Sequence, residues 1–160
     1  MRKIMLNGRW ELAEAGKDTL CAVQVPGSVL SGLYGAGKIE DPFYRTNEDA
    51  TRELFWKDYE FCRTFAVTED VLNEKKVILV CEGLDTLADI YINGKKDGHD
   101  ELTPGWTSYR KHLCFQTYEV TDYLKEGKNA AGSYFGRCLS ISKIMSMKRI
   151  KRSIMFPAAE

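Results

Sequence analysis

Apolar and polar residues alternate with a period of two along much of this chain, and this alternation constrains the fold more than any other feature. In GRWELAEA it places Trp10 and Leu12 on one face. In KDYEFCRTFAV the residues on one face are Tyr59, Phe61, Arg63 and Phe65. Because successive side chains of a β-strand point to opposite sides of a sheet, the pattern predicts strands with one buried face. Amphipathic patterns of helical length are scarce.

The clearest strand unit is KKVILVCEGLDTLADIYINGKKDG. Its apolar run ends at a break at Gly83, a second strand follows over Leu87–Ile92, and Asn93-Gly94 then accepts the positive φ angles of a type I′ turn. A further strand is expected in HLCFQTYEV. Many short strands with turn signals every ten residues or so, about the spacing in known sandwiches, favour a β-sandwich over a parallel α/β sheet.

Three segments predict short helical turns between the strands. They are SVLSGLYGAG, TEDVLNEKK, where Thr68 can cap, and VTDYLKEGKN, where Gly127 is a natural C-terminal stop. The polar segment DPFYRTNED is expected to be a loop, because it is too polar for a core strand.

Composition and charge exclude several partners. The 160 residues are 44% hydrophobic, which is enough for one domain with a core. Lys plus Arg and Asp plus Glu each number 23, so charge gives no reason to expect nucleic acid or an anionic membrane. The N-terminus has no apolar signal-like region and no stretch is long enough to span a bilayer, so a cytoplasmic chain is expected.

Cysteine and histidine spacing predicts neither a disulfide framework nor a metal or cofactor site. The two histidines, His99 and His112, have no partner at metal-ligand spacing. The cysteines are odd in number and scattered, and we expect buried free thiols. These cysteines are Cys21, Cys62, Cys81, Cys114 and Cys138. GLYGAGK lacks the spacing of a phosphate-binding loop.

The chain resembles the N-terminal, sugar-binding domain of glycoside hydrolase family 2, and within that family the β-mannosidases. The resemblance is carried by LNGRWEL, VQVPGSVLSGLYGAGKIEDPFYRTNEDATRELFWKDYEFCRTFAV and VILVCEGLDTLADIYINGKK, in the family's order, over roughly residues 6–98. It implies a jelly-roll β-sandwich of the galactose-binding-domain-like type. In the family this sandwich leads a chain that continues with an immunoglobulin-like sandwich and a catalytic (β/α)8 barrel, neither of which fits within 160 residues.

The next segment, LTPGWTSYRKHLCFQTYEVTDYLKEGKNAAGSYFG over residues 102–136, resembles the accessory sandwich of bacterial α-L-rhamnosidases. Both resemblances imply the same architecture, so the expected fold is an all-β jelly-roll sandwich with short helical turns over residues 1–136. Residues 137–160 match neither family and are expected to form a separate basic tail.

The tail has two interpretations. Its isoleucines and methionines are spaced loosely enough for a basic amphipathic helix. Alternatively, it is an unrelated end that replaces the closing strands and leaves the sandwich with an unpaired sheet edge. The ragged apolar spacing favours the second interpretation. The basic residues are Arg137, Lys143, Lys148, Arg149, Lys151 and Arg152, against Glu160 alone.

The resemblance assigns a role to the polar loop. In the family, a Pro-x-Tyr-x-x-Asn segment reaches toward the active site of the barrel, and its Asn, matched here by Asn47, can bind a sugar hydroxyl. Tyr44 and Phe43 could wall the same site, and Glu48 could accept from a hydroxyl. Asp41 and Pro42 would stiffen the turn. In the alternative interpretation the loop is structural, and Asn47 and Asp49 bond their own backbone.

Tryptophan gives a second route to sugar binding, because pyranose faces stack on its ring. Trp56 and Trp106 are the candidates, whereas Trp10 lies in a strand pattern and is expected in the core. A turn pinned by a buried ring explains PGWTSY equally well.

No residues are predicted to be catalytic. Glycoside hydrolysis needs two carboxyl groups about 5 to 9.5 Å apart, one with a raised pKa. The acidic pairs Glu40-Asp41, Glu69-Asp70 and Asp100-Glu101 are consecutive and fall in expected turns. The resemblance places the family's catalytic glutamates on the barrel, so the chain is expected to be inactive alone.

Two function classes remain. The first is a carbohydrate-binding accessory domain of a β-mannosidase-like glycoside hydrolase, whose partners are a glycoside and the catalytic barrel. The second is a structural or protein-interaction sandwich that binds no sugar.

Overall fold

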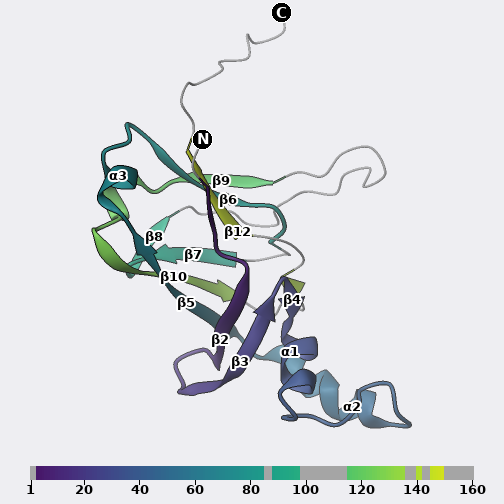
Figure 1. The fold of residues 1–160 in the computed structure, drawn as a ribbon. Coiled ribbons are helices and arrows are strands. Elements are labelled where there is room, and N and C mark those ends of the chain that lie inside the picture. The colour runs from purple at the N-terminus through teal and green to yellow at the C-terminus, as the bar shows by residue number, and fades with distance from the viewer. Residues whose placement is uncertain (1–2, 85–87, 98–114, 136–139, 142–144, 150–160) are drawn as a thin grey trace, which may run out of the picture.

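The computed structural model describes residues 3–84, 88–97, 115–135, 140–141 and 145–149. Within these ranges the chain forms two antiparallel sheets that pack face to face (Figure 1). The predicted β-sandwich is therefore confirmed. No helix in these ranges has both the length and the apolar character needed to cross a membrane.

The larger sheet has the strand order β3-β2-β5-β10-β7-β8. Its strands are β3 (Thr19–Val25), β2 (Gly8–Glu14), β5 (Tyr59–Val67), β10 (Gly127–Phe135), β7 (Ala88–Ile92) and β8 (Lys95–Asp97). The smaller sheet has the order β1-β12-β6-β9, and β4 pairs with β11 separately. These strands are β1 (Lys3–Met5), β12 (Met145–Arg149), β6 (Val77–Cys81), β9 (Gln116–Glu119), β4 (Gly27–Ser28) and β11 (Ser140–Ile141).

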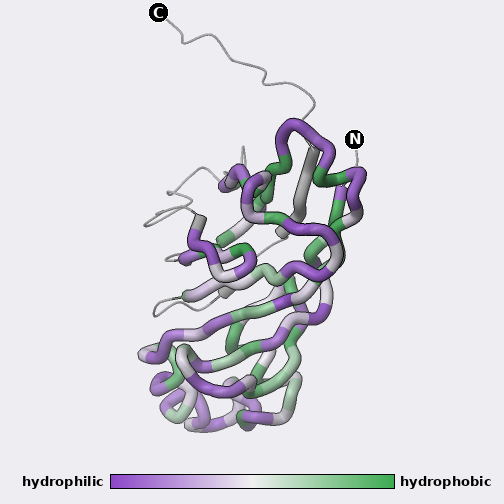
Figure 2. The backbone as a smooth tube through the Cα atoms, turned by 90° about the vertical axis from the view of Figure 1, so that its left-hand side faces the viewer, coloured by the Kyte–Doolittle hydropathy of each residue, from purple (hydrophilic) through white to green (hydrophobic). Residues whose placement is uncertain are grey.

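The core lies between the two sheets and follows the period-two alternation, which Figure 2 shows as alternating hydropathy along the strands. Trp10 is 1% exposed, and its Nε1 donates to the carbonyl oxygen of Leu6 at 2.7 Å. The rings of Phe61 and Phe135, on neighbouring strands, meet edge to face with centroids 5.6 Å apart. Trp10 is thus a core residue, as predicted.

The β7–β8 hairpin turns at Asn93 and Gly94, whose φ angles are 51° and 78°. The Asn93 amide also bonds to the neighbouring strand β10: its Nδ2 donates to Asn129 Oδ1 at 2.7 Å, and its Oδ1 accepts from the backbone N–H of Ala130 at 2.9 Å. The predicted turn is confirmed.

Helical turns occur in all three segments that predict them, two as α-helices and one as a 3-10 turn. In α1 (Val29–Gly35), Ser28 and Ser31 form a reciprocal capping box. Thr68 is the N-cap residue of α3 (Glu69–Leu72), although its hydroxyl bonds to the Asp70 carboxylate instead of capping the backbone.

The third segment differs from the prediction only in where its helical turn ends. Its 3-10 turn, η2 (Thr121–Tyr123), ends before Leu124. Gly127, at φ +80°, opens β10 instead of closing a helix.

Two further predictions are wrong for the residues that the structure describes. The polar loop contains a helix, α2 (Asn47–Arg52), followed by a 3-10 turn, η1 (Glu53–Trp56). In the tail, β12 lies between β1 and β6 and pairs with both, so this part is neither a helix nor an unintegrated end. Without β12 those two strands would present unpaired backbone groups to each other. The other tail residues lie outside the described ranges.

The cysteine prediction holds only in part. Cys81 is buried and Cys21 is half-buried, but Cys62 is exposed because it lies on the outward face of β5. None of these three described cysteines forms a disulfide, while Cys114, Cys138 and both histidines lie outside the described residues.

Candidate functional site

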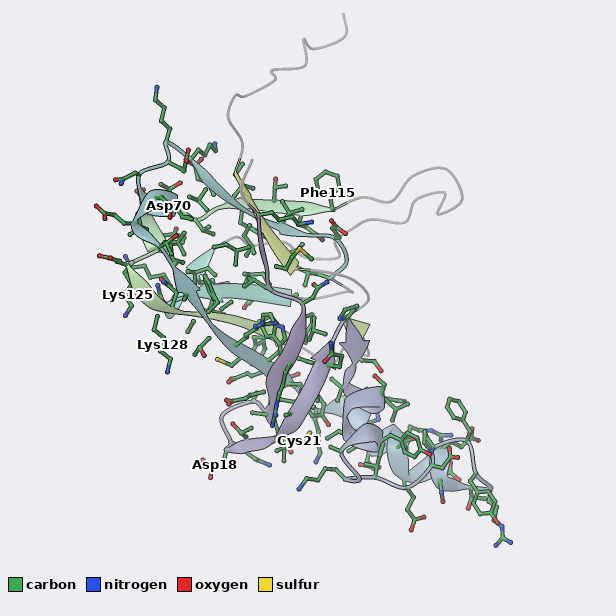
Figure 3. The ribbon with its side chains drawn as sticks, in the orientation of Figure 1. Asp18, Cys21, Asp70, Phe115, Lys125 and Lys128 are labelled. Atoms are coloured by element: carbon green, nitrogen blue, oxygen red, sulfur yellow. The ribbon has the colours of Figure 1, made fainter. Side chains whose placement is uncertain are left out.

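Residues 29–57, between β4 and β5, form an excursion that carries α1, α2 and η1; we call it the aromatic projection. It extends from one end of the sandwich (Figure 1), opposite the end that carries Lys125 and Lys128 (Figure 3). Its exposed rings are Tyr34, Phe43, Tyr44 and Trp56, with exposed fractions of 49%, 91%, 57% and 66%. Large apolar side chains are thus concentrated on a part of the surface outside the core.

A tight turn at Asp41 sets the shape of the aromatic projection. The carboxylate of Asp41 accepts from the backbone N–H of Phe43 at 2.9 Å, and its carbonyl oxygen accepts from the N–H of Tyr44 at 3.1 Å. Pro42 is buried beside it. These contacts match the stiffening role that the sequence predicts for Asp41 and Pro42.

Asn47 begins α2 and is half-buried. Its Nδ2 donates to the carbonyl oxygen of Asp41 at 2.9 Å, so the amide does bond the backbone of its own loop, as the structural interpretation expects. Among the described residues no donor bonds to its Oδ1. Asn47 also lines a pocket of about 180 Å³, whose other lining residues are Ile39, Glu40, Ala50, Thr51 and Leu54.

The remaining predicted site residues fall in different places. Glu48 is exposed in the first turn of α2, and Trp56 ends η1. The structure therefore places Tyr44, Asn47, Glu48 and Trp56 on the aromatic projection. Trp106 lies outside the described residues.

Asp49 does not bond its own backbone in the way that the structural interpretation expects. Its carboxylate instead pairs with Arg52 one turn along α2, at 3.2 Å.

Tyr34 is a surface ring that the sequence reasoning did not select. Val29 and Leu33, four residues apart in α1, are buried on one face, and Tyr34 follows Leu33 onto another face. This helical spacing was the signal that could have identified Tyr34 as exposed.

In two of the acidic pairs, the aspartate accepts a hydrogen bond within its own turn. Asp41 caps its own turn, and Asp70 accepts from Thr68 at the start of α3. Asp100-Glu101 lies outside the described residues. Within the described ranges, no group of three His, Cys, Asp or Glu side chains could hold a metal ion.

Glu14 links the aromatic projection to the larger sheet. Its carboxylate accepts from Lys17 at 2.6 Å, and from Lys57, just after η1, at 3.2 Å. The hydrogen bond from Lys17 and then that from Lys57 lower the pKa of Glu14, although partial burial opposes the shift. The N–H of Ala15 donates to the carbonyl oxygen of Asp58 at 2.9 Å and reinforces the junction.

Exposed rings and an amide with a spare acceptor are groups that recognise sugars, because ring faces stack on pyranoses and amides bond to hydroxyls. The two antiparallel sheets, packed face to face, define the class of the chain as a β-sandwich.

Residues 10–136 match the family model of the glycosyl hydrolase 2 galactose-binding domain-like family. Because the match covers most of the chain, this chain belongs to that family. The resemblance inferred from the sequence is confirmed.

Curated relatives include both enzyme groups that the sequence resembles. A probable β-mannosidase from Caenorhabditis elegans is 28% identical over 79% of this chain, which corresponds to 13% of the relative's own length. An α-L-rhamnosidase from Streptomyces avermitilis is 46% identical over 30% of this chain and 5% of its own length. The chain thus spans a small part of the relatives it matches.

Among solved structures, the β-D-mannosidase from Dictyoglomus thermophilum superposes with a TM-score of 0.79 at 24% identity. The superposition covers 93% of this chain and 23% of the mannosidase chain. At this identity the likeness supports the fold alone.

Proposed function

We propose that this chain is a carbohydrate-binding accessory domain of a β-mannosidase-like glycoside hydrolase, and that its aromatic projection helps to form the sugar site beside a catalytic barrel. Tyr44, Asn47, Glu48 and Trp56, together with Trp106, are the residues proposed to contact sugar. The domain alone binds glycosides weakly and does not hydrolyse them.

One observation carries the proposal. Asn47 lines a pocket at the start of α2, on the same excursion as four exposed rings. The Asp41 turn already holds its Nδ2, so the amide is oriented before a ligand arrives and its Oδ1 can accept from a hydroxyl. A sandwich that served only as packing would gain little from exposing these rings.

The test combines the purified chain with a β-mannosidase barrel polypeptide and measures turnover of an aryl β-mannoside. Asn47→Ala should lower kcat/KM in the complex by about 10- to 100-fold, which corresponds to one lost hydrogen bond of roughly 1 to 3 kcal/mol. Asn73→Ala, an exposed amide beside α3, is the matched control and should change nothing.

Two results would contradict the proposal. Hydrolysis by the chain alone that a point substitution in this chain abolishes would make it an enzyme. An unchanged kcat/KM combined with a steep fall in the melting temperature of Asn47→Ala would favour the second candidate, a structural sandwich. The bond from Asn47 to Asp41 is the observation that favours this second candidate.

A further inference from the structure

The outward face of the larger sheet carries a hollow that the aromatic projection does not include. On the central strands β5 and β10, every second residue faces the core, and the intervening ones face outward. The outward set includes small side chains in the middle of the sheet and larger ones around them. The small residues are Cys62, Thr64, Ala66, Ala130 and Gly132.

The strand register places these small residues between larger neighbours. Cys62 pairs with Gly132 on β10 and with Glu11 on β2, and Gly132 pairs in turn with Tyr91 on β7. A row across four strands therefore has a low centre, with a carboxylate on one side and a phenol ring on the other.

Two adjoining hollows result, and we call them together the outer trough. One, of about 280 Å³, is lined by Glu60, Cys62, Tyr91, Gly132 and Tyr134, with Phe61 and Ser133 beneath. The other, of about 270 Å³, is lined by Arg9, Trp10, Glu11, Cys62, Arg63 and Thr64. They share Cys62, and each approaches the lower size of a small-ligand site, about 300 Å³.

Gly132 deepens the trough without a structural need for glycine. A Cβ at this position would lie 3.8 Å from the carbonyl oxygen of Phe61 and 3.8 Å from Tyr91 Cβ, which is ordinary van der Waals contact. Its φ is not in the left-handed region. Since a glycine within a strand weakens it, a glycine that neither packing nor backbone requires indicates close approach of something else.

The walls of the trough are held in place. The Tyr134 hydroxyl donates to Asp58 Oδ2 at 2.7 Å, which fixes the ring, and this bond raises the pKa of Tyr134 so that it stays a phenol. Beside Tyr91, Lys96 forms an ion pair with Asp89 at 2.7 Å.

The chemistry of the lining selects the occupant. Two half-exposed tyrosine rings offer apolar faces, and Glu11, Glu60 and Arg9 offer hydrogen bonds with charges of both signs. Neither a polyanion nor a polycation matches this mixture, whereas a neutral molecule with alternating C–H faces and hydroxyl groups does.

We propose that the outer trough is a second binding site, separate from the aromatic projection, and that it takes a neutral oligosaccharide along its tyrosine walls. This proposal rests on the residues that line the trough, and it does not depend on the role of Asn47. Another glycosidase domain or a second copy of this chain would be the competing occupant.

The experiment follows amide chemical shifts of the purified chain with β-1,4-linked mannohexaose, cellohexaose and xylohexaose, each up to about 10 mM, a concentration that detects millimolar affinity. In parallel, mass spectrometry follows alkylation of Cys62 by iodoacetamide. Partial desolvation by its neighbours on the sheet, followed by the nearby Glu11 and Glu60 carboxylates, raises the pKa of the Cys62 thiol, so the reaction is run at about pH 9. At least one glycan should shift residues of the trough and slow Cys62 alkylation severalfold.

In Gly132→Val the added Cβ lies at ordinary contact distance and the two methyl groups occupy the trough, so binding should weaken about tenfold or more. Tyr91→Ala should weaken binding similarly and serves if the first variant folds poorly. Phe115→Ala removes an exposed ring at the start of β9 and should leave binding unchanged (Figure 3).

Three outcomes overturn the proposal. Failure of all three glycans to shift the trough is one. Binding that Trp56→Ala abolishes but Gly132→Val leaves intact is another, since the only sugar site would then be the aromatic projection. The last is concentration-dependent protection of Cys62 without glycan, together with a dimer mass, because the trough would then be an interface between copies.

Discussion

The sandwich and its aromatic projection differ in how they use tryptophan, as the exposure of Trp10 and Trp56 shows. Trp10, on β2, is 1% exposed and bonds Leu6, whereas Trp56, at the end of η1, is 66% exposed. The same side chain therefore contributes to the free energy of folding in one region and to the surface in the other. The ring of Trp10 belongs to the core, whereas the rings of the aromatic projection lie at the surface.

Replacing each tryptophan by alanine should give the largest difference in stability between the two regions. Trp10→Ala removes a fully buried ring and should lower the free energy of unfolding by about 3 to 5 kcal/mol, whereas Trp56→Ala should lower it by about 0.5 kcal/mol or less. Urea unfolding followed by circular dichroism measures both. If Trp10→Ala does not fold, Trp10→Phe keeps most of the bulk and should still cost about 1 to 2 kcal/mol through the lost bond to Leu6. Equal losses for the two positions would remove the distinction.

The sandwich could be predicted from the sequence because its signals are local. Along β2 and β5, successive side chains point to opposite faces of the sheet. The alternation of apolar and polar residues is therefore enough to predict that Trp10 and Phe61 lie in the core. The same parity places Cys62 outward, a signal that its apolar residue type concealed. Asn93-Gly94 likewise carries its turn within two residues.

The parts that could not be predicted depend on distant partners. The tail strand β12 forms because β1 and β6 leave a gap that it fills, and nothing within residues 145–149 indicates that gap. Helix α2 is six residues long, too short to show a period, and follows a turn held by the Asp41 bonds. For the candidate site, the sequence supplied Tyr44, Asn47 and Trp56 but not the pocket beside Asn47, which needs Leu54 from η1.

The side-chain amides of Asn129 and Asn47 also differ in burial between the two regions, with a smaller expected effect on stability. Asn129 is the buried amide. At 1% exposed, it accepts from the Lys125 N–H at 2.9 Å and from Asn93 Nδ2 at 2.7 Å, and it donates to the carbonyl oxygen of Lys125 at 2.7 Å. Asn129→Ala should lower the free energy of unfolding by about 2 to 3 kcal/mol, since these groups would lose their partner without gaining water. Chemical denaturation measures the loss. A change below about 0.5 kcal/mol would show that water replaces the amide there.

Asn47 is the amide of the aromatic projection, and its truncation should matter less for folding. Within the described part of the chain its side chain makes one bond, to Asp41 in an exposed turn, so Asn47→Ala should lower the free energy of unfolding by about 0.5 to 1 kcal/mol. The same denaturation series as for Asn129→Ala gives the comparison. A loss as large as that of Asn129→Ala would assign Asn47 to the framework of the fold.

The smallest expected effect concerns Glu14, which joins the two regions through Lys57. Because the bonds from Lys17 and then Lys57 lower the folded-state pKa of Glu14 below its unfolded value, their stabilisation is present above the unfolded pKa, about 4.3, and is lost as the pH falls through the folded pKa. Glu14→Gln should therefore reduce stability at neutral pH but change little in acid, and added salt should shrink the difference. Denaturation midpoints measured from neutral to acidic pH, with Glu69→Gln on α3 as the control, test this expectation. If Glu14→Gln leaves the pH profile of stability unchanged, these ion pairs do not hold the aromatic projection to the sheet, and the Ala15 to Asp58 backbone bond is the connection that remains.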